Sequence, residues 1–207
     1  KGAEGSIKKI EGKAKAKKIP LYYSDKSRMD RDADGGNHQG VIAVVSDYEY
    51  ATVEEILDVA KQRGEDPFVI LLDPHNLGAI MRTAECAGAH GVIIPKRRSV
   101  SITETVAKTS AGAVEYMPCA RVTNMARTIE QLQEAGLWIA ACDMDGDTLT
   151  EADLKGPIGI VIGSEGFGVS RLVREKCDFI VSIPMRGRIT SLNASNAASI
   201  LMYEIVR

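Results

Sequence analysis

Three short segments carry polar side chains of the kinds that enzymes use, and each follows an apolar stretch. The first holds Asn76 and Arg82, six positions apart, shortly after the apolar run FVILL. Arg82 lies inside the sequence AIMRTAECA, where a positive charge needs a partner. The pattern favours two interpretations equally: a functional cation, or a surface arginine whose aliphatic stem covers neighbouring apolar surface.

The second segment, GIVIGSEGFGVSRLV at 159–173, is a glycine-rich turn between an apolar strand and a helix. Gly163, Gly166 and Gly168 allow close backbone approach to a ligand and positive φ angles. The spacing is GxxGxG rather than GxGxxG, and a lone glycine turn is weak evidence for a dinucleotide site. Glu165 would repel a pyrophosphate, so the turn suits a ligand with hydroxyl groups or a positive centre.

The third segment, IPMRGRITSLNASNAAS at 183–199, runs from a strand end through a basic turn into a helix of small residues. Serine and asparagine commonly cap helices. Four of them within six positions exceed what capping needs: Ser191, Asn193, Ser195 and Asn196. The alanines that follow would let this helix pack closely on a neighbour.

Apolar strands alternate with helices from residue 52 onward. Helices are expected at 52–63, from about residue 76 through 89, near 103–111, at 124–135, at 169–176 and from 193, with Thr52 and Glu55 forming a capping box. Strands are expected at 68–72, 91–95, 137–142, 159–163 and 179–184. Continuous apolar strands between helices predict an α/β fold with an open parallel sheet, whose ligands bind beyond the carboxyl ends of the strands.

Residues 1–50 are predicted to be separate from the α/β domain at 51–207. They show a basic helix at 6–18, a short strand at 19–23, a polar loop at 24–40 and a strand at 41–45. We expect them to be the C-terminal part of a small α/β domain whose first elements precede this sequence. Residues 1–40 hold 10 Lys and Arg against 6 Asp and Glu, whereas the rest holds 16 against 22. This asymmetry favours a nucleic-acid partner, although a lysine-rich helix is also typical of a solvated face.

The composition excludes several classes of protein. With 44% hydrophobic and 26% charged residues, the 207-residue chain is typical of a globular protein. It has no apolar run long enough for a membrane span and no secretory signal, so we expect no membrane association and a cytoplasmic location. The four scattered cysteines are expected to be reduced thiols, and the three scattered histidines indicate no metal site.

The sequence resembles the SpoU/TrmH branch of the SPOUT superfamily of RNA methyltransferases. The resemblance rests on three motifs in this order: N-x6-R at 76/82, GSEGFG at 163–168 and IPM…SLNAS at 183–195. Residues 1–50, which include GGNHQGVIA, are similar to the end of the ribosomal-protein-like RNA-binding domain of the RlmB type. That type methylates a guanosine ribose in large-subunit (23S) ribosomal RNA. The resemblance implies a homodimer and a C-terminal deep trefoil knot, a rare exception to unknotted topology.

The resemblance also implies the chemistry. S-adenosyl-L-methionine would be the cofactor, and Arg82 would activate a ribose 2′-hydroxyl, either as a base or, as its permanent charge favours, electrostatically. The target and Arg82 would be oriented by Asn76, Glu165, Ser191 and Asn193. The cofactor would be held by Gly163, Gly168, Ile183, Met185 and Leu192. RNA would be contacted by Lys8, Lys9, Lys13, His38, Arg186 and Arg188.

Two other functions remain open at this point. One is 2′-O-methylation of transfer RNA, which the basic N-terminal part disfavours, because compact transfer-RNA enzymes of this branch use short terminal helices instead. The other is a non-catalytic knotted RNA-binding or ribosome-assembly protein, which the complete set of site residues argues against. An enzyme that uses nicotinamide or flavin is a more distant possibility.

Overall fold

The computed structural model describes residues 2–33, 35–44, 48–72, 76–96, 101–164 and 168–207. The chain divides into two compact units, Lys1–Asp47 and Tyr48–Arg207. Within the described ranges, no helix is both long and apolar enough to cross a membrane.

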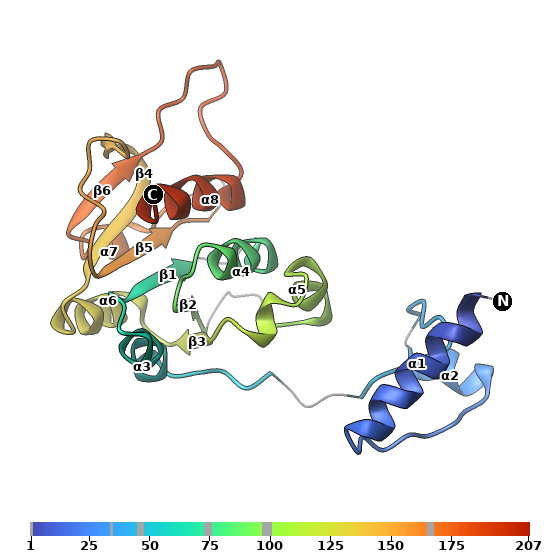
Figure 1. Cartoon of the computed structure of the whole chain (residues 1–207). Helices are drawn as coiled ribbons and strands as arrows, with labels where there is room; N and C mark the ends of the chain where they lie inside the picture. Colours follow the sequence, from blue (N-terminus) through green and yellow to red (C-terminus); the bar gives the residue numbers. More distant parts are fainter. Residues whose placement is uncertain (1, 34, 45–47, 73–75, 97–100, 165–167) are drawn as a thin grey trace. The chain divides into compact units, whose positions relative to one another are not determined.

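The second unit is built on a six-stranded, wholly parallel open sheet, which confirms the predicted sheet (Figure 1). Its strands lie in the order β3-β2-β1-β5-β4-β6. They are β1 (Phe68–Leu72), β2 (Gly91–Pro95), β3 (Cys119–Val122), β4 (Trp138–Thr148), β5 (Ile158–Ile162) and β6 (Phe179–Ser182). The three C-terminal strands lie together on one side, so the loops that follow them share one edge of the sheet.

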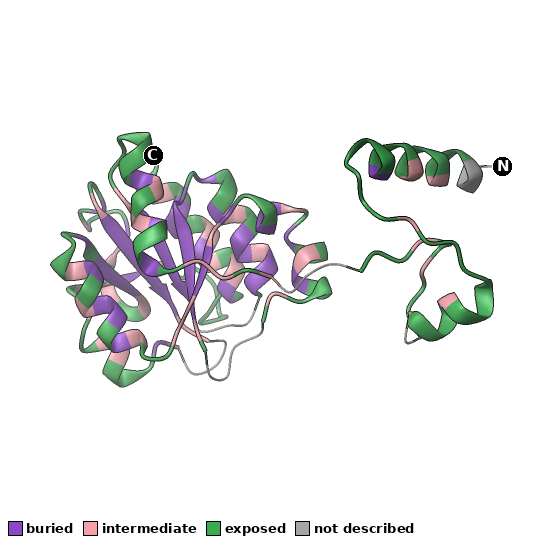
Figure 2. Ribbon diagram, turned by 90° about the horizontal axis from the view of Figure 1, so that it is seen from below, coloured by how far each residue is buried: buried purple, intermediate pink, exposed green. Residues whose placement is uncertain are grey.

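Helices cover both faces of this sheet, and the buried residues form a layer between them (Figure 2). Side chains alternate along β1: Ile70 and Leu72 join one core cluster, whereas Val69 and Leu71 join the other. The first cluster packs under α4 (Leu77–Cys86), α5 (Glu104–Thr109) and α8 (Ala194–Ile205). The second packs under α3 (Val53–Arg63), α6 (Met125–Glu134) and α7 (Arg171–Arg174). Strands buried on both faces explain the continuous apolar runs in the sequence.

Local sequence signals set the ends of several helices. The capping box predicted for α3 is confirmed: Glu55 N donates to Thr52 Oγ1 at 3.2 Å, and Thr52 N donates to Glu55 Oε2 at 2.8 Å. Gly64 ends this helix with φ 66°. At Gly78 a Cβ would lie 2.7 Å from the backbone oxygen of Val106 in α5, so the close packing of α4 against α5 requires glycine.

Four features of the second unit differ from the sequence-based prediction. Strand β3 and the 3-10 helix Ala113–Glu115 were not predicted, because CARV is short and lies at the edge of the sheet. Strand β4 continues to Thr148 instead of ending at 142, since the polar residues after Cys142 bulge out before pairing resumes at Asp147. Helix α7 spans four residues rather than 169–176, because Gly168 is still paired with Ser164 in the glycine turn and the helix begins only after its N-cap Ser170.

The first unit contains α1 (Gly2–Ala16) and α2 (Lys26–Asp32). The strand predicted at 19–23 is wrong: the segment is irregular, Pro20 has no N–H to donate, and Tyr22 and Tyr23 are exposed. The strand predicted at 41–45 is wrong for residues 41–44, which are irregular, and residue 45 lies outside the described residues. The loop predicted at 24–40 contains α2, whose N-cap Asp25 accepts a hydrogen bond from Arg28 N at 2.9 Å.

Candidate functional site

A cavity of about 550 Å³ lies beyond the carboxyl ends of β4, β5 and β6, where open parallel sheets bind ligands. Its walls come from the bulge of β4, the glycine turn after β5, the segment after β6 and the first turns of α8. The lining residues are Cys142, Asp143, Met144, Ile162, Gly163, Ser164, Gly168, Ile183, Met185, Thr190, Ser191, Leu192, Asn193, Ala194 and Ala197.

The glycine turn brings the chain back against itself at the cavity. Ser164 N donates to Gly168 O at 3.1 Å, and Gly168 N donates to Ser164 O at 3.0 Å. A Cβ on Gly163 would lie 2.1 Å from the carbonyl carbon of Gly168, so only glycine fits there. Gly168 itself has φ 64°, in the left-handed region. Glu165, predicted to be catalytic, lies outside the described residues.

The start of α8 forms another wall. Asn193 is its N-cap, and its Oδ1 accepts hydrogen bonds from Ser195 N at 2.9 Å and from Ser195 Oγ at 2.5 Å. Capping therefore accounts for part of the Ser and Asn cluster. Ser191 and Leu192 precede the helix and line the cavity as exposed residues. Ala194 and Ala197 leave room for a ligand beside the first turn of the helix.

The structure brings the predicted cofactor residues to this one cavity. Gly163, Gly168, Ile183, Met185 and Leu192 all line it. Two residues predicted to be catalytic, Ser191 and Asn193, lie beside them. Residues as far apart in sequence as Gly163 and Leu192 thus share one site, although their roles stay predictions.

Asn76 and Arg82 belong to α4, which lies beside α8 (Figure 1). Asn76 is the N-cap of α4 and has φ 69°, a left-handed conformation that costs energy in a residue other than glycine. Arg82 is exposed and is not among the described residues that line the cavity. The next residue, Thr83, has its Oγ1 3.2 Å from Ser199 Oγ of α8. Arg82 therefore lies next to the α4–α8 contact, on a helix packed against one wall of the site.

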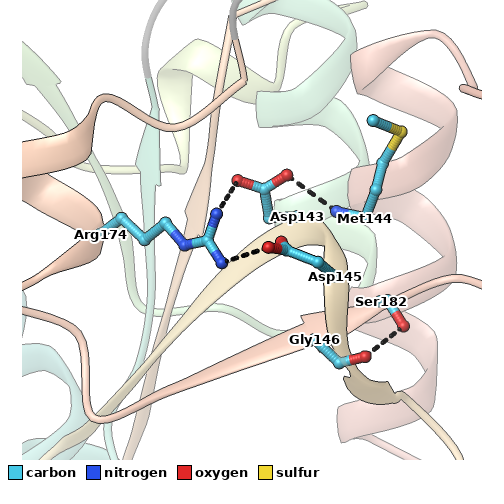
Figure 3. A network of polar contacts seen from close by, with 6 residues as sticks. All are labelled: Asp143, Met144, Asp145, Gly146, Arg174 and Ser182. Atoms are coloured by element: carbon cyan, nitrogen blue, oxygen red, sulfur yellow. Dashed lines mark hydrogen bonds and ion pairs between the residues drawn. The ribbon is translucent and has the colours of Figure 1, made fainter.

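The sequence analysis did not identify the wall formed by the bulge of β4. Asp143 lines the cavity, and Arg174 Nη1 lies 3.4 Å from its Oδ2, while Nη2 lies 2.8 Å from Asp145 Oδ2 (Figure 3). Burial, together with the nearby Asp143 charge, raises the pKa of the Cys142 thiol to about 11, so this cysteine is a neutral lining group at pH 7. The signal in the sequence was an acidic run, DMDGD, directly after an apolar strand.

The residues predicted to contact RNA lie in both units. In the first unit, Lys8, Lys9 and Lys13 are exposed on α1. His38 is mostly buried, and its ring is engaged on both sides: Nδ1 accepts from Gly40 N at 3.0 Å, and Nε2 lies 3.0 Å from Asp30 Oδ1. His38 therefore holds its own loop together. In the second unit, Arg186 and Arg188 are exposed in the segment before α8.

Comparisons with known proteins identify the family. The SpoU rRNA Methylase family matches residues 68–203, and a family described as RNA 2′-O ribose methyltransferase substrate binding matches residues 1–51. The chain therefore belongs to the SpoU rRNA methylase family. It is 47% identical over 209 residues to YacO of Bacillus subtilis, named as a TrmH family tRNA/rRNA methyltransferase; the match covers 99% of this chain and 84% of YacO.

Solved structures agree with this assignment. The SpoU methyltransferase AviRb from Streptomyces viridochromogenes, in complex with the cofactor AdoMet (S-adenosylmethionine), is 32% identical with a TM-score of 0.62, over 68% of this chain and 57% of AviRb. An AdoMet-bound rRNA methyltransferase from Sinorhizobium meliloti is 29% identical with a TM-score of 0.65, over 76% and 60% of the two chains. This chain thus spans less than two thirds of those solved chains.

Proposed function

We propose that this chain transfers a methyl group to a ribose 2′-hydroxyl of large-subunit ribosomal RNA, with a guanosine as the target nucleotide. As a member of its family, the protein is an S-adenosylmethionine-dependent RNA 2′-O-ribose methyltransferase. The observation that carries the proposal is the cavity beyond β4, β5 and β6, which gathers seven of the residues predicted for cofactor binding and catalysis.

The residues of the cavity fit S-adenosylmethionine. A volume of about 550 Å³ lies within the roughly 300–1,000 Å³ usual for small-molecule sites. Glycines and alanines leave backbone groups accessible, while Ile183, Met185 and Leu192 supply apolar surface for a purine ring. When bound, the cofactor would supply a methyl group on a sulfonium centre, whose leaving group is the neutral thioether S-adenosylhomocysteine.

The protein's task is then to position and activate the acceptor. A ribose hydroxyl is a weak acid and a poor nucleophile, so a cation that stabilises the developing alkoxide lowers the barrier. Arg82 is the candidate, because it is exposed on α4 beside the contact with α8. Its charge is permanent, so we favour electrostatic stabilisation, with the proton passing to solvent or to an RNA phosphate. Asn76, Glu165, Ser191 and Asn193 would orient Arg82 and the nucleotide.

The presence of the N-terminal unit favours ribosomal RNA over transfer RNA, because compact transfer-RNA enzymes of this branch use short terminal helices instead. Residues 1–51 match a substrate-binding family, and the exposed lysines of α1 offer positive charge to phosphates. Transfer RNA stays the alternative, because YacO is named for both substrates. Because this chain's curated relatives are bacterial, we also propose that the reaction takes place in the cytoplasm.

We also propose that the segment from β6 through α8 is threaded as a trefoil knot and that two copies pair through this region. The small residues of α8 support close packing, since Ala198 is fully buried and Ser199 contacts Thr83 of α4. The outer side of α8 exposes apolar residues that a second copy would cover: Ile200, Tyr203 and Val206, with 41%, 54% and 47% of their surface accessible. A two-fold dimer is the commonest closed assembly.

The deciding experiment maps 2′-O-methyl groups in ribosomal and transfer RNA from cells with and without the gene. Loss of one methylated guanosine in large-subunit RNA, restored by the wild-type gene and not by Arg82→Ala, is the expected result. Loss of a site in transfer RNA would establish the alternative. No lost site in either RNA would overturn the proposed function.

A further inference from the structure

The bulge of β4 is an excursion of four residues whose shape is determined by its neighbours. Strand β4 pairs with β6 up to Cys142 and again from Asp147, so residues 143–146 leave the sheet. On one side, Ser182 Oγ of β6 donates to Gly146 O at 2.8 Å. A Cβ on Gly146 would lie 2.4 Å from the backbone of Ile180, so the excursion presses directly against β6. This contact leaves the other end of the excursion, with Asp143, facing the cavity.

Arg174 of α7 holds that other end. Its guanidinium spans the two carboxylates of Asp143 and Asp145, while Met144 N donates to Asp143 Oδ1 at 2.8 Å (Figure 3). The Asp143 side chain keeps 20% of its surface accessible and Arg174 keeps 32%, so the pair is largely shielded from water. The hydrogen bond from Arg174 lowers the pKa of Asp145 below its usual value, because it stabilises the charged carboxylate.

Asp143 faces the glycine turn. A Cβ placed on Gly168 would lie 3.8 Å from Asp143 Oδ2 and 4.0 Å from Oδ1. The carboxylate uses two of its roughly four acceptor positions on Met144 N and Arg174, so it can accept further hydrogen bonds from the cavity side. A carboxylate beside a glycine turn at the carboxyl end of parallel strands is the arrangement that binds ribose hydroxyls in other α/β folds.

We propose that Asp143 accepts hydrogen bonds from the ribose hydroxyls of the cofactor's adenosine, and that Arg174 is the positioning residue that holds Asp143 at the cavity edge. The inference rests on the proposed function, in which S-adenosylmethionine occupies this cavity. The geometry also explains the acidic run DMDGD: Asp143 faces the ligand, Asp145 anchors Arg174, and Gly146 permits contact with β6.

The test measures binding by calorimetry with S-adenosylhomocysteine and its 2′-deoxy and 3′-deoxy analogues. Asp143→Asn should weaken binding of S-adenosylhomocysteine by about ten- to a hundred-fold, the range for a hydrogen bond to a charged group. Removing the ribose hydroxyl that Asp143 contacts should weaken binding to the wild type by a similar factor and to Asp143→Asn by less than about twofold. If Asp143 had only a structural role, removing the hydroxyl would weaken binding to Asp143→Asn by the same factor as binding to the wild type.

Arg174→Gln should weaken binding by about two- to tenfold, the cost of ordering a freed side chain. Arg174→Lys keeps the positive charge but lacks the planar guanidinium that contacts both carboxylates. Its affinity should therefore lie between those of the wild type and Arg174→Gln. The matched control is Arg171→Gln on the same helix, which removes an exposed ion pair with Glu175 and should leave affinity unchanged. Circular dichroism and thermal melting verify that each variant is folded.

Two results would overturn the inference. One is wild-type affinity for S-adenosylhomocysteine in folded Asp143→Asn. The other is that both deoxy analogues lose as much affinity for Asp143→Asn as they lose for the wild type. Failure of the proposed function looks different, because wild-type protein itself would then bind neither S-adenosylmethionine nor S-adenosylhomocysteine.

Discussion

Substituting alanine for Gly163 tests whether the shape of the glycine turn creates the cofactor cavity. The new Cβ would lie 2.1 Å from the Gly168 carbonyl carbon and 2.4 Å from both Gly168 O and Val169 N. All three are backbone atoms that no side-chain rotation can remove. Ordinary carbon contacts are about 3.5 Å or longer, so the two sides of the turn would have to part by more than about 1 Å.

This displacement has two measurable consequences. Overpacking of this kind costs about 1–3 kcal/mol, which for a domain of this size lowers the Tm by roughly 2–12 °C. The displaced turn also lines the cavity, so affinity for S-adenosylhomocysteine should fall by about tenfold or more, as for the loss of a well-placed hydrogen bond. Thermal melting and calorimetry on the same preparation measure both effects.

The matched control is Gly136→Ala. Gly136 has φ 94° with open space where a Cβ would be, and it is not among the residues lining the cavity. Its substitution should lower the free energy of unfolding by about 1–2 kcal/mol, because alanine is strained at this φ angle, and should leave the affinity for S-adenosylhomocysteine unchanged. Wild-type affinity in folded Gly163→Ala protein would show that the turn does not shape the site.

Four further results are expected. Arg82→Ala should lower single-turnover methylation by about 10²–10³-fold with little change in cofactor affinity, and near-normal turnover per folded molecule would remove Arg82 from the catalytic residues. Neutralising the lysines of residues 8–18 should reduce the salt dependence of RNA binding, whereas an unchanged slope would make them only a solvated face. Light scattering should show a dimer, and a fully active monomer at assay concentration would refute pairing. Iodoacetamide at pH 8.5 should modify exposed Cys86 and spare Cys142, whose neutral thiol persists until the pH approaches its pKa of about 11; rapid labelling of both would contradict this.

The sequence by itself determined the parallel sheet, because strands buried on both faces must be continuously apolar, as FVILL and IGIVI are. It also identified the three segments that carry the candidate site. The number of glycines at one strand end, and of Ser and Asn residues at one helix start, exceeds what a turn or a helix cap requires. The capping box of α3 followed from Thr52 and Glu55 alone, because it involves only neighbours in the chain.

Local sequence patterns did not predict two kinds of segment correctly: a polar segment that pairs as a strand, and an apolar segment that has no strand to pair with. The strand predicted at 19–23 did not form, because a strand needs a neighbour to receive its hydrogen bonds and sequence periodicity does not supply one. The continuation of β4 through Asp147 and Thr148 was not predicted, because its polar sequence is typical of a loop. Pairing with β6 stabilises it as a strand.

Tertiary structure alone decided how the site is assembled. Nothing in the spacing of Asp143, Gly168 and Arg174 indicates that they meet, because the contacts depend on β4 lying between β5 and β6 with α7 beside the bulge. Likewise, only the packing of α4 on α8, through Thr83 and Ser199, brings the helix of Arg82 next to the helix whose first turn lines the cavity. The sequence determined which residues carry the chemistry, and the order of strands in the sheet determined which of them lie together, since that order depends on contacts between distant segments.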